Sequence, residues 1–233
     1  MKNILKLFYC GFLLIGATSC ELFGLDYSKG ADFDGKVDDN RIDMTVLEFM
    51  ESREDLFSDM LAAIHYAEVE DIYMEDGNTY ILLTNSSLTG SASTSYWNRE
   101  KVEVNGEMIS AGSWEQYPKE KIAEMLRYHV VKGEYSYYNL TSAVTWAQTY
   151  GTGVFDYVKN GETLKGDTAV MALNVGQDRN LPLQLNNFPW NYRGELAATT
   201  GSCRTTNLHL NNGYAHVTDY YLERPTRKFM GQE

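Results

Sequence analysis

The sequence is poor in basic residues. Its 233 residues include 20 Lys and Arg against 32 Asp and Glu, which gives a formal net charge of -12. Nucleic acids attract proteins through clusters of Lys and Arg that neutralise phosphates and release counterions, and the sequence contains no such cluster. We therefore expect no nucleic-acid partner and a solvated, acidic surface.

Motifs for catalysis, cofactors and metals are also missing. There is no G-x-S-x-G nucleophile elbow and no phosphate loop ending in Gly-Lys-Ser or Gly-Lys-Thr. The four histidines, His65, His129, His209 and His216, include no pair at the i, i+4 spacing of a helical metal site. We expect no enzyme, no cofactor and no metal. The paired carboxylates of a glycoside hydrolase converge only in three dimensions, so a glycan hydrolase stays open as an alternative.

Hydrophobic runs long enough to span a bilayer are absent. The apolar stretch from Leu7 to Ile15 is shorter than the ~20 residues that a membrane-spanning helix needs. It follows Lys2 and Lys6 and precedes a group of small residues, which is the layout of an export signal. Residues 1–19 are therefore predicted to be a signal peptide.

The end of this segment resembles the lipobox of bacterial lipoproteins. Small residues at 17–19 directly precede Cys20, and in that family the cysteine is diacylated and becomes the mature N-terminus. The resemblance implies lipidation of Cys20 and a membrane anchor, with ordinary cleavage nearby as the alternative. Cys10 would then be removed, leaving Cys203 without a partner for an internal disulfide. We interpret Cys203 as a small structural residue.

Residues 20–41 are predicted to be an acidic tether. They are rich in Gly, Asp, Asn and Ser and contain few large apolar side chains, a composition that buries too little surface to fold. The run DFDGKVDDN resembles part of a calcium loop, but it lacks the full ligand spacing and the closing Glu. A solvated linker is therefore the expectation.

Order is predicted to begin at residue 42. Thr45 and Glu48 have capping-box spacing, and apolar residues continue at helical spacing to Ile64, which predicts two short helices. A short apolar run from Tyr80 to Leu83 has the length of a buried strand.

Turn signals then divide the chain. Asn105 and Gly106 suit a tight hairpin turn, and Pro118 suits the first position of a helix. The later part of the chain is mainly β in pattern and closes with a hairpin around Asn212 and Gly213. Helices early and antiparallel strands late, without alternating βαβ units, predict an α+β fold.

Three segments resemble the fasciclin domain family in this order. They are TYILLTNSSL with Thr84 and Asn85, KIAEMLRYHVVKGEYSYYNL with Tyr128 and His129, and NNGYAHVTDYYL with His216 and Asp219. The resemblance implies one domain over 42–233, a β-sandwich or wedge packed with several helices, with insertions at 86–117 and 143–206. It also implies adhesion, meaning the binding of proteins, matrix or glycans without a cofactor.

The motif residues are interpreted mainly as structural. His129 follows an amphipathic helix and precedes two valines, so its imidazole is expected to satisfy buried backbone groups with Tyr128 packed beside it. An exposed Tyr-His adhesion motif is the alternative that the resemblance implies. His216 and Asp219 are expected to support the closing hairpin.

Aromatic residues in polar stretches are the candidate binding residues. Exposed rings can stack on sugars or anchor protein interfaces, whereas core filling is their commoner role and the one favoured here. The candidates are Trp97, Trp114, Trp146, Trp190 and Tyr192.

These patterns together predict a lipid-anchored outer-membrane protein at the cell surface, whose domain binds a protein or glycan. The alternative is an accessory structural subunit of an outer-membrane nutrient-uptake complex. Its partners would be an outer-membrane transporter or sibling lipoproteins.

Overall fold

The structure, a computed structural model, describes residues 41–152, 157–159, 162–164, 169–176, 182–188 and 200–224. Contacts divide the chain into two units, Met1–Asp39 and Asn40–Glu233, and every described residue belongs to the second. The predicted signal peptide, Cys20 and nearly all of the predicted tether lie outside the described residues. None of the described helices is long and apolar enough to cross a membrane.

Helices dominate the first half of the described chain, and strands dominate the second. The helices are α2 (Val46–Glu51), α3 (Glu54–Ala67), α4 (Glu70–Met74), α5 (Asn85–Leu88), α6 (Tyr96–Arg99), the 3-10 helix η1 (Trp114–Gln116) and α7 (Lys119–Tyr128). The strands are β1 (Asn78–Leu83), β2 (Val102–Val104), β3 (Glu107–Ile109), β4 (Val130–Lys132), β5 (Thr145–Gln148), β6 (Tyr157–Lys159), β7 (Glu162–Leu164), β8 (Val170–Asn174), β9 (Gln184–Leu185), β10 (Gly201–Ser202), β11 (Thr205–Leu210) and β12 (Gly213–Thr218). The α+β prediction is confirmed.

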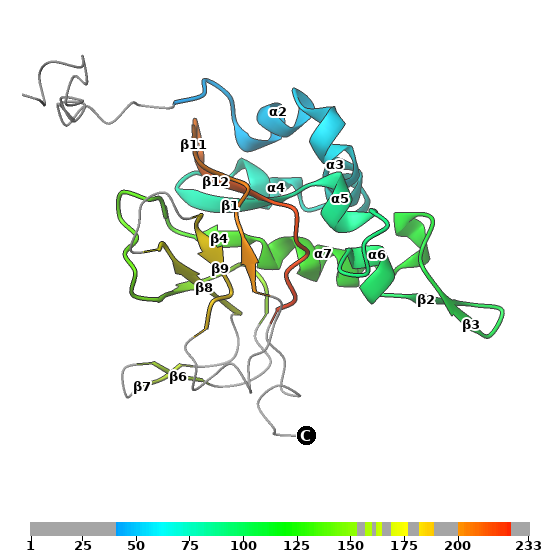
Figure 1. The fold of residues 1–233 in the computed structure, drawn as a ribbon. Helices are drawn as coiled ribbons and strands as arrows, with labels where there is room; N and C mark the ends of the chain where they lie inside the picture. The colour runs from blue at the N-terminus through cyan, green and yellow to red at the C-terminus, as the bar shows by residue number, and fades with distance from the viewer. Residues whose placement is uncertain are drawn as a thin grey trace, which may run out of the picture. The chain divides into compact units, whose positions relative to one another are not determined.

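Two four-stranded sheets organise the domain (Figure 1). The first has the order β11-β12-β1-β4 and the second the order β10-β9-β8-β5. Within the first sheet, β1 pairs in parallel with β12, from Asn78 opposite Gly213 to Leu83 opposite Thr218. The turn signals predicted antiparallel hairpins only. They could not predict this parallel pair, because its two strands lie far apart along the chain.

Strand β1 lies inside the first sheet and is covered on both faces, and all six of its residues are buried. Tyr80 and Leu82 belong to the core shared with the helices, whereas Ile81 belongs to the core shared with the second sheet. Alternate strand residues point to opposite faces, so β1 contributes to both cores. Figure 1 accordingly shows α2 to α5 on one side of β1 and β12, with β8 and β9 on the other.

The helical lead-in has the predicted cap but one more helix than predicted. The Thr45 backbone N–H donates to Glu48 Oε2 at 2.7 Å, and the Glu48 N–H donates to Thr45 Oγ1 at 3.4 Å, which completes the capping box. Helix α3 ends at Ala67 because Glu68 takes a left-handed conformation with φ 53°. The short helix α4 then forms as a separate element.

The β2–β3 hairpin has its predicted turn. Asn105 and Gly106 take φ of 54° and 86°, the positive values that a two-residue type I′ turn requires. Helix α7 begins at Lys119, and Pro118 is its N-cap. The sequence had predicted Pro118 as the first helical residue, so the helix begins one residue later than predicted.

The closing hairpin differs from the prediction by one residue. Its turn consists of Asn211 and Asn212, and Gly213 is already paired with Leu210 as the first residue of β12. Gly213 has φ 147°, and a Cβ at this position would lie 2.1 Å from the carbonyl oxygen of Asn78. Glycine is therefore required for the close approach of β1 and β12.

Candidate functional site

The first motif residues lie where β1 ends and α5 begins. The Thr84 hydroxyl donates to the Asp219 carboxylate at 2.8 Å, which joins the first and last motif segments. Asn85 Oδ1 accepts from the Asp59 backbone N–H at 3.0 Å, and its amide donates to Ser58 Oγ at 3.0 Å. Each contact ties one chain segment to another.

The Tyr128-His129 pair is buried. The two rings meet edge to face with centroids 5.5 Å apart, and His129 Nδ1 lies 2.8 Å from the Met125 carbonyl oxygen. The Tyr128 hydroxyl lies 2.8 Å from Asn186 Oδ1. Burial lowers the pKa of His129 to about 4, although the Met125 contact acts in the opposite direction. The pair is thus neutral and enclosed at pH 7, which does not fit an exposed adhesion motif.

His216 makes hydrogen bonds at an irregular point of the closing hairpin. Its Nε2 lies 2.8 Å from the Tyr135 carbonyl oxygen, and its Nδ1 accepts from the Asn207 backbone N–H at 3.2 Å. Asn207 has a positive φ of 58° and lies in the register shift between Thr205 and Leu208. Burial also lowers the pKa of His216 to about 4, so a neutral imidazole links β12 to two other segments.

The three candidate tryptophans that the structure describes do not form an exposed platform. Trp114 is 6% exposed, and Trp97 is partly buried, with their rings 5.7 Å apart and edge to face. Trp146 is also partly buried and packs 5.3 Å from Phe188. An exposed role for Trp114 is wrong because η1 turns it into the helical core. Trp190 and Tyr192 lie outside the described residues.

Cys203 is a buried thiol, 4% exposed, and burial raises its pKa above the ordinary range. Across the part of the chain that the structure describes, no group of three His, Cys, Asp or Glu residues could hold a metal ion.

A pocket of about 650 Å³ lies between α7, the end of α6 and the segment after β12. Its volume is within the range of small-molecule sites. Two of the motif segments, 121–140 and 211–222, supply lining residues. The sequence did not predict the pocket, because tertiary packing decides that these segments meet there. Lining residues are Tyr96, Glu100, Glu120, Lys121, Glu124, Met125, Tyr128, Tyr221, Leu222, Glu223 and Arg224.

Helix α7 supplies one wall of the pocket. Glu120, Glu124 and Tyr128 recur at intervals of four residues, as do Lys121 and Met125, and residues four apart are neighbours on one side of a helix. The polar ends of this wall lie at the pocket rim, while Tyr128 lies fully buried beneath it. The wall thus combines charged groups with an apolar base.

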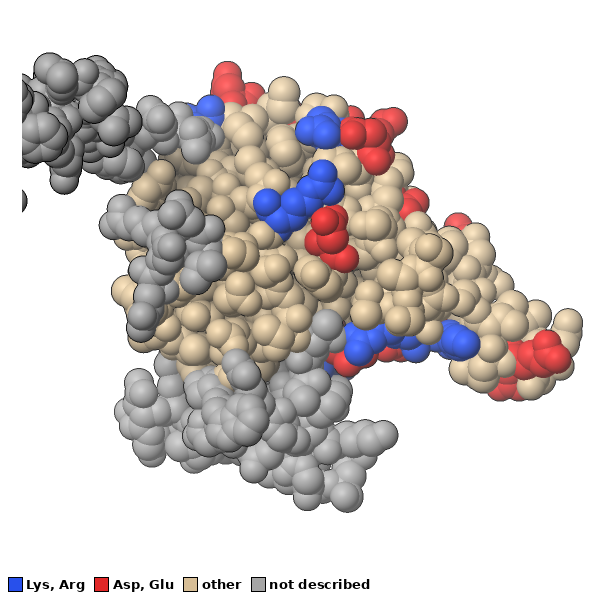
Figure 2. Space-filling view, viewed as in Figure 1, with Lys and Arg blue, Asp and Glu red and all other residues tan. Residues whose placement is uncertain are grey.

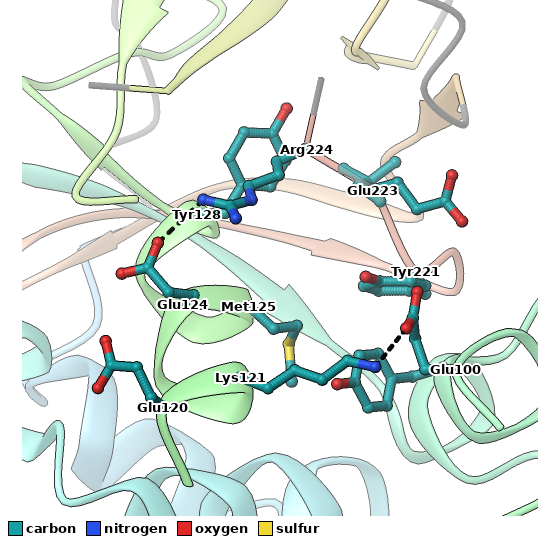
Figure 3. A pocket seen from close by; sticks show the side chains of 11 residues that line it. Glu100, Glu120, Lys121, Glu124, Met125, Tyr128, Tyr221, Glu223 and Arg224 are labelled. Carbon is teal, nitrogen blue, oxygen red and sulfur yellow. Dashed lines mark hydrogen bonds and ion pairs between the residues drawn. The ribbon is translucent and has the colours of Figure 1, made fainter. Parts of the chain in front are cut away.

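Ion pairs span the pocket rim (Figure 3). Lys121 Nζ lies 2.6 Å from the Glu100 carboxylate, and Arg224 lies 3.1 Å from Glu124. Arg99 lies 3.3 Å from Glu223, and Arg127 lies 2.7 Å from the exposed Glu120. Every carboxylate that lines the pocket therefore has a cationic partner.

Glu124 is the most strongly held of these carboxylates. Burial acts to raise the pKa of Glu124, but hydrogen bonds from Thr152 and Arg127 and the charge of Arg224 outweigh it, so the pKa lies below its usual value. The Thr152 hydroxyl donates to Glu124 at 2.7 Å, and Arg224 also donates to the Thr152 carbonyl oxygen at 2.6 Å. This corner of the pocket is therefore a pre-organised, ionised network.

The floor of the pocket is aromatic. Tyr96 is 1% exposed and Tyr221 is 7% exposed, with ring centroids 4.8 Å apart in an edge-to-face arrangement. Tyr96 also packs against Trp114 and Tyr117, at 5.8 and 5.3 Å. The Tyr96 hydroxyl is buried, and it has no hydrogen-bond partner among the described residues.

Comparison with known proteins gives a likeness among solved structures. No family model and no curated protein matches the chain. Among solved structures, the chain is similar to a FAS1 domain pair from the insect cell adhesion molecule fasciclin I, with a TM-score of 0.41 and 14% identity. The match covers 76% of this chain and 45% of that chain, so it spans less than half of the insect chain. The α+β class of this chain follows from its own helices and sheets.

Proposed function

We propose that this chain is a lipid-anchored surface protein whose fasciclin-like domain, residues 42–233, is a binding or adhesion module and not an enzyme. The sequence resemblance of the three motif segments supports the adhesion class. The lipobox resemblance at Cys20 supports an outer-membrane anchor. The pocket beside α7 is the observation that carries the proposal, because it combines a rigid aromatic floor with ordered polar groups at its rim.

The charges on the described surface fit such a module. Figure 2 shows basic and acidic side chains lying beside one another on this face, without a continuous basic area. Mixed charges of this kind support a neutral glycan or a protein ligand better than a polyanion.

A glycan hydrolase finds no support at the pocket. A general acid needs a carboxyl group that stays protonated near neutral pH. Glu124 has the opposite property, since its pKa lies below the usual value. We therefore retain binding without turnover as the proposed activity.

A second candidate function is the accessory subunit of an outer-membrane uptake complex. The β2–β3 hairpin favours it, because Met108 and Ile109 are 59% and 40% exposed on a short hairpin that projects from the helices (Figure 1). Exposed apolar side chains on a projecting element are common at protein interfaces.

One experiment separates the two. The tagged full-length protein is recovered from its native envelope in mild detergent, with Cys20→Ala as the control, and is also applied to glycan and protein arrays. Binding to an array ligand, with the protein recovered alone, is the expected result. A stoichiometric transporter or lipoprotein partner, together with blank arrays, would replace the binding module by the accessory subunit.

A further inference from the structure

The surface that a ligand can reach in the pocket beside α7 is polar. The tyrosines of its floor, Tyr96, Tyr128 and Tyr221, are at most 7% exposed. The side chains of Lys121 and Arg224, by contrast, are 42% and 30% exposed. A sugar that stacks on an aromatic ring needs an open ring face, and none of these three rings offers one. Recognition in this pocket therefore rests on its charged side chains.

Arg224 is fixed through only one of its nitrogens. Its Nη1 donates to the Thr152 carbonyl oxygen at 2.6 Å, to Thr152 Oγ1 at 2.9 Å and to Glu124 Oε2 at 3.1 Å. Nε and Nη2 make no hydrogen bond to a described residue. These two nitrogens share one edge of the planar guanidinium, a fork that matches the two oxygens of a carboxylate. The pocket thus presents an unused fork in a fixed orientation.

Glu124 leaves room for a second carboxylate beside Arg224. Its Oε2 accepts from the Thr152 backbone N–H at 3.0 Å, from the Thr152 hydroxyl at 2.7 Å and from Arg224. Its Oε1 accepts from Arg127 at 3.1 Å. These four bonds occupy the lone-pair sites of Glu124, and two guanidinium groups offset its charge. A phosphate dianion would meet stronger repulsion than a carboxylate from the four glutamates that line the pocket.

The Lys121–Glu100 ion pair offers both a donor and an acceptor to the same ligand. Lys121 Nζ lies 2.6 Å from Glu100 Oε2. An ammonium has three donors and a carboxylate about four lone-pair sites, so both groups keep sites free while the ion pair stays intact. Figure 3 shows this pair on a different side of the pocket from Arg224. A peptide backbone can use both groups, because its residues carry a carbonyl acceptor and an N–H donor.

We propose that the pocket beside α7 binds the C-terminal carboxylate of a peptide segment in a protein ligand. The carboxylate lies on the Nε–Nη2 edge of Arg224, and the preceding backbone amides contact the Lys121–Glu100 pair. Capture of a chain terminus in this way is a recurring mode of peptide recognition. This inference rests on the proposed binding function and names the ligand class of its pocket.

The test compares two forms of the same peptides on the full-length protein. One pool contains N-acetylated tripeptides with a free C-terminal carboxylate, and the other contains the same tripeptides as C-terminal amides. Saturation-transfer NMR ranks the binders, and calorimetry measures the affinity of the best. Amidation removes the negative charge and one acceptor oxygen and leaves the rest of the peptide unchanged. Hexuronic acids and inorganic phosphate are the comparison anions.

Two matched arginine variants separate the fork from the charge. Arg224→Lys keeps a positive charge beside Glu124 but has no planar fork. Arg127→Lys is the control, because Arg127 also donates to Glu124 but does not line the pocket. We expect the tripeptide acids to bind, the amides to bind at least tenfold more weakly, and Arg224→Lys to weaken binding of the acids about tenfold. Arg127→Lys should bind as the unmodified protein does.

The melting temperatures of both variants show whether they fold, and the comparison of acids with amides needs no variant. Equal binding of acids and amides, equal affinity of Arg224→Lys and the unmodified protein, or tighter binding of a hexuronic acid or phosphate would overturn the inference. An equal loss in Arg127→Lys would also overturn it, because Arg224 would then act only through Glu124.

The outcome for the proposed function can be distinguished from the outcome for this inference. If no tripeptide binds but a glycan or a folded protein binds on the arrays, the proposed function stands and only the carboxylate site is removed. Blank arrays, no tripeptide binding and a stoichiometric envelope partner would remove both.

Discussion

Thr84 and Asp219 lie 135 residues apart in the sequence, and the Thr84 hydroxyl donates a 2.8 Å hydrogen bond to the Asp219 carboxylate. Thr84 follows β1 and is 2% exposed, and Asp219 follows the neighbouring strand β12. The bond thus closes the carboxyl end of the parallel pair. It gives two of the motif residues a structural role.

Loss of this bond should destabilise the domain. Thr84→Ala is expected to lower the free energy of unfolding by about 1–2 kcal/mol, because a buried hydrogen bond to a charged group is removed. A double-mutant cycle with Asp219→Ala, followed by urea denaturation, should give a coupling energy of about 1 kcal/mol. Thr84→Ser keeps the hydroxyl and is the control. Simple additivity of the two substitutions would show that the bond contributes nothing.

Asn212 should be the most sensitive polar residue of the closing turn. It is 3% exposed, accepts from the Val46 backbone N–H at 3.0 Å and donates to the Tyr73 carbonyl oxygen at 2.9 Å. Asn212→Ala leaves both buried groups unpaired and is expected to cost about 2–4 kcal/mol in denaturant unfolding. The exposed neighbour Asn211 is the matched control, and Asn211→Ala should change stability by less than about 0.5 kcal/mol. Equal effects of the two substitutions would contradict this role.

Two glycines allow steric contact to be separated from backbone strain. Both Gly213 and Gly77 have positive φ, but only at Gly213 would a Cβ meet another atom within 4 Å, the Asn78 carbonyl oxygen. Gly77→Ala should cost about 1 kcal/mol from strain alone. Gly213→Ala should cost more than about 3 kcal/mol or prevent folding, because β1 and β12 must separate. Circular dichroism during thermal unfolding measures both, and similar midpoints would argue against the close approach.

Stability should fall as the pH drops below neutrality. Burial lowers the pKa of His129 and His216 from about 6.5 to about 4, so the unfolded chain binds more protons than the folded chain between these values. The free energy of unfolding should be steady above pH 6.5 and decrease from pH 6.5 to 4, by about 3 kcal/mol for each histidine at the lower limit.

Denaturant titrations across this range test the pH effect. His216→Asn should flatten the decrease, whereas the exposed His65→Gln should keep it. A decrease of unchanged size in His216→Asn would assign the pH dependence to His129 or to carboxylates instead.

Local patterns in the sequence were sufficient for several elements. The capping box at Thr45, the helix before His129 and the Asn105-Gly106 turn depend on neighbours within a few residues, and the structure contains all three. The buried strand at Tyr80 could be predicted for a similar reason, since a continuous apolar run suits a strand covered on both faces.

Other features depend on where distant segments meet. The sequence left Trp114 with two roles, core filling, which was favoured, and exposed binding, and contacts with Tyr96 and Trp97 place it in the core. The turn at Asn212 lies one residue earlier in the chain than predicted, because Gly213 faces Asn78 on another strand. No window of sequence around either residue contains its partner.

The sequence by itself determined the acidic balance, the N-terminal signal pattern, the helical first half and the strand-rich second half, because each depends on composition or on short-range periodicity. Only the tertiary structure decided the parallel pairing of β1 with β12, the burial of the Tyr128-His129 pair and the pocket beside α7. These features bring together residues from distant segments, and long-range packing, not local propensity, sets which of them meet.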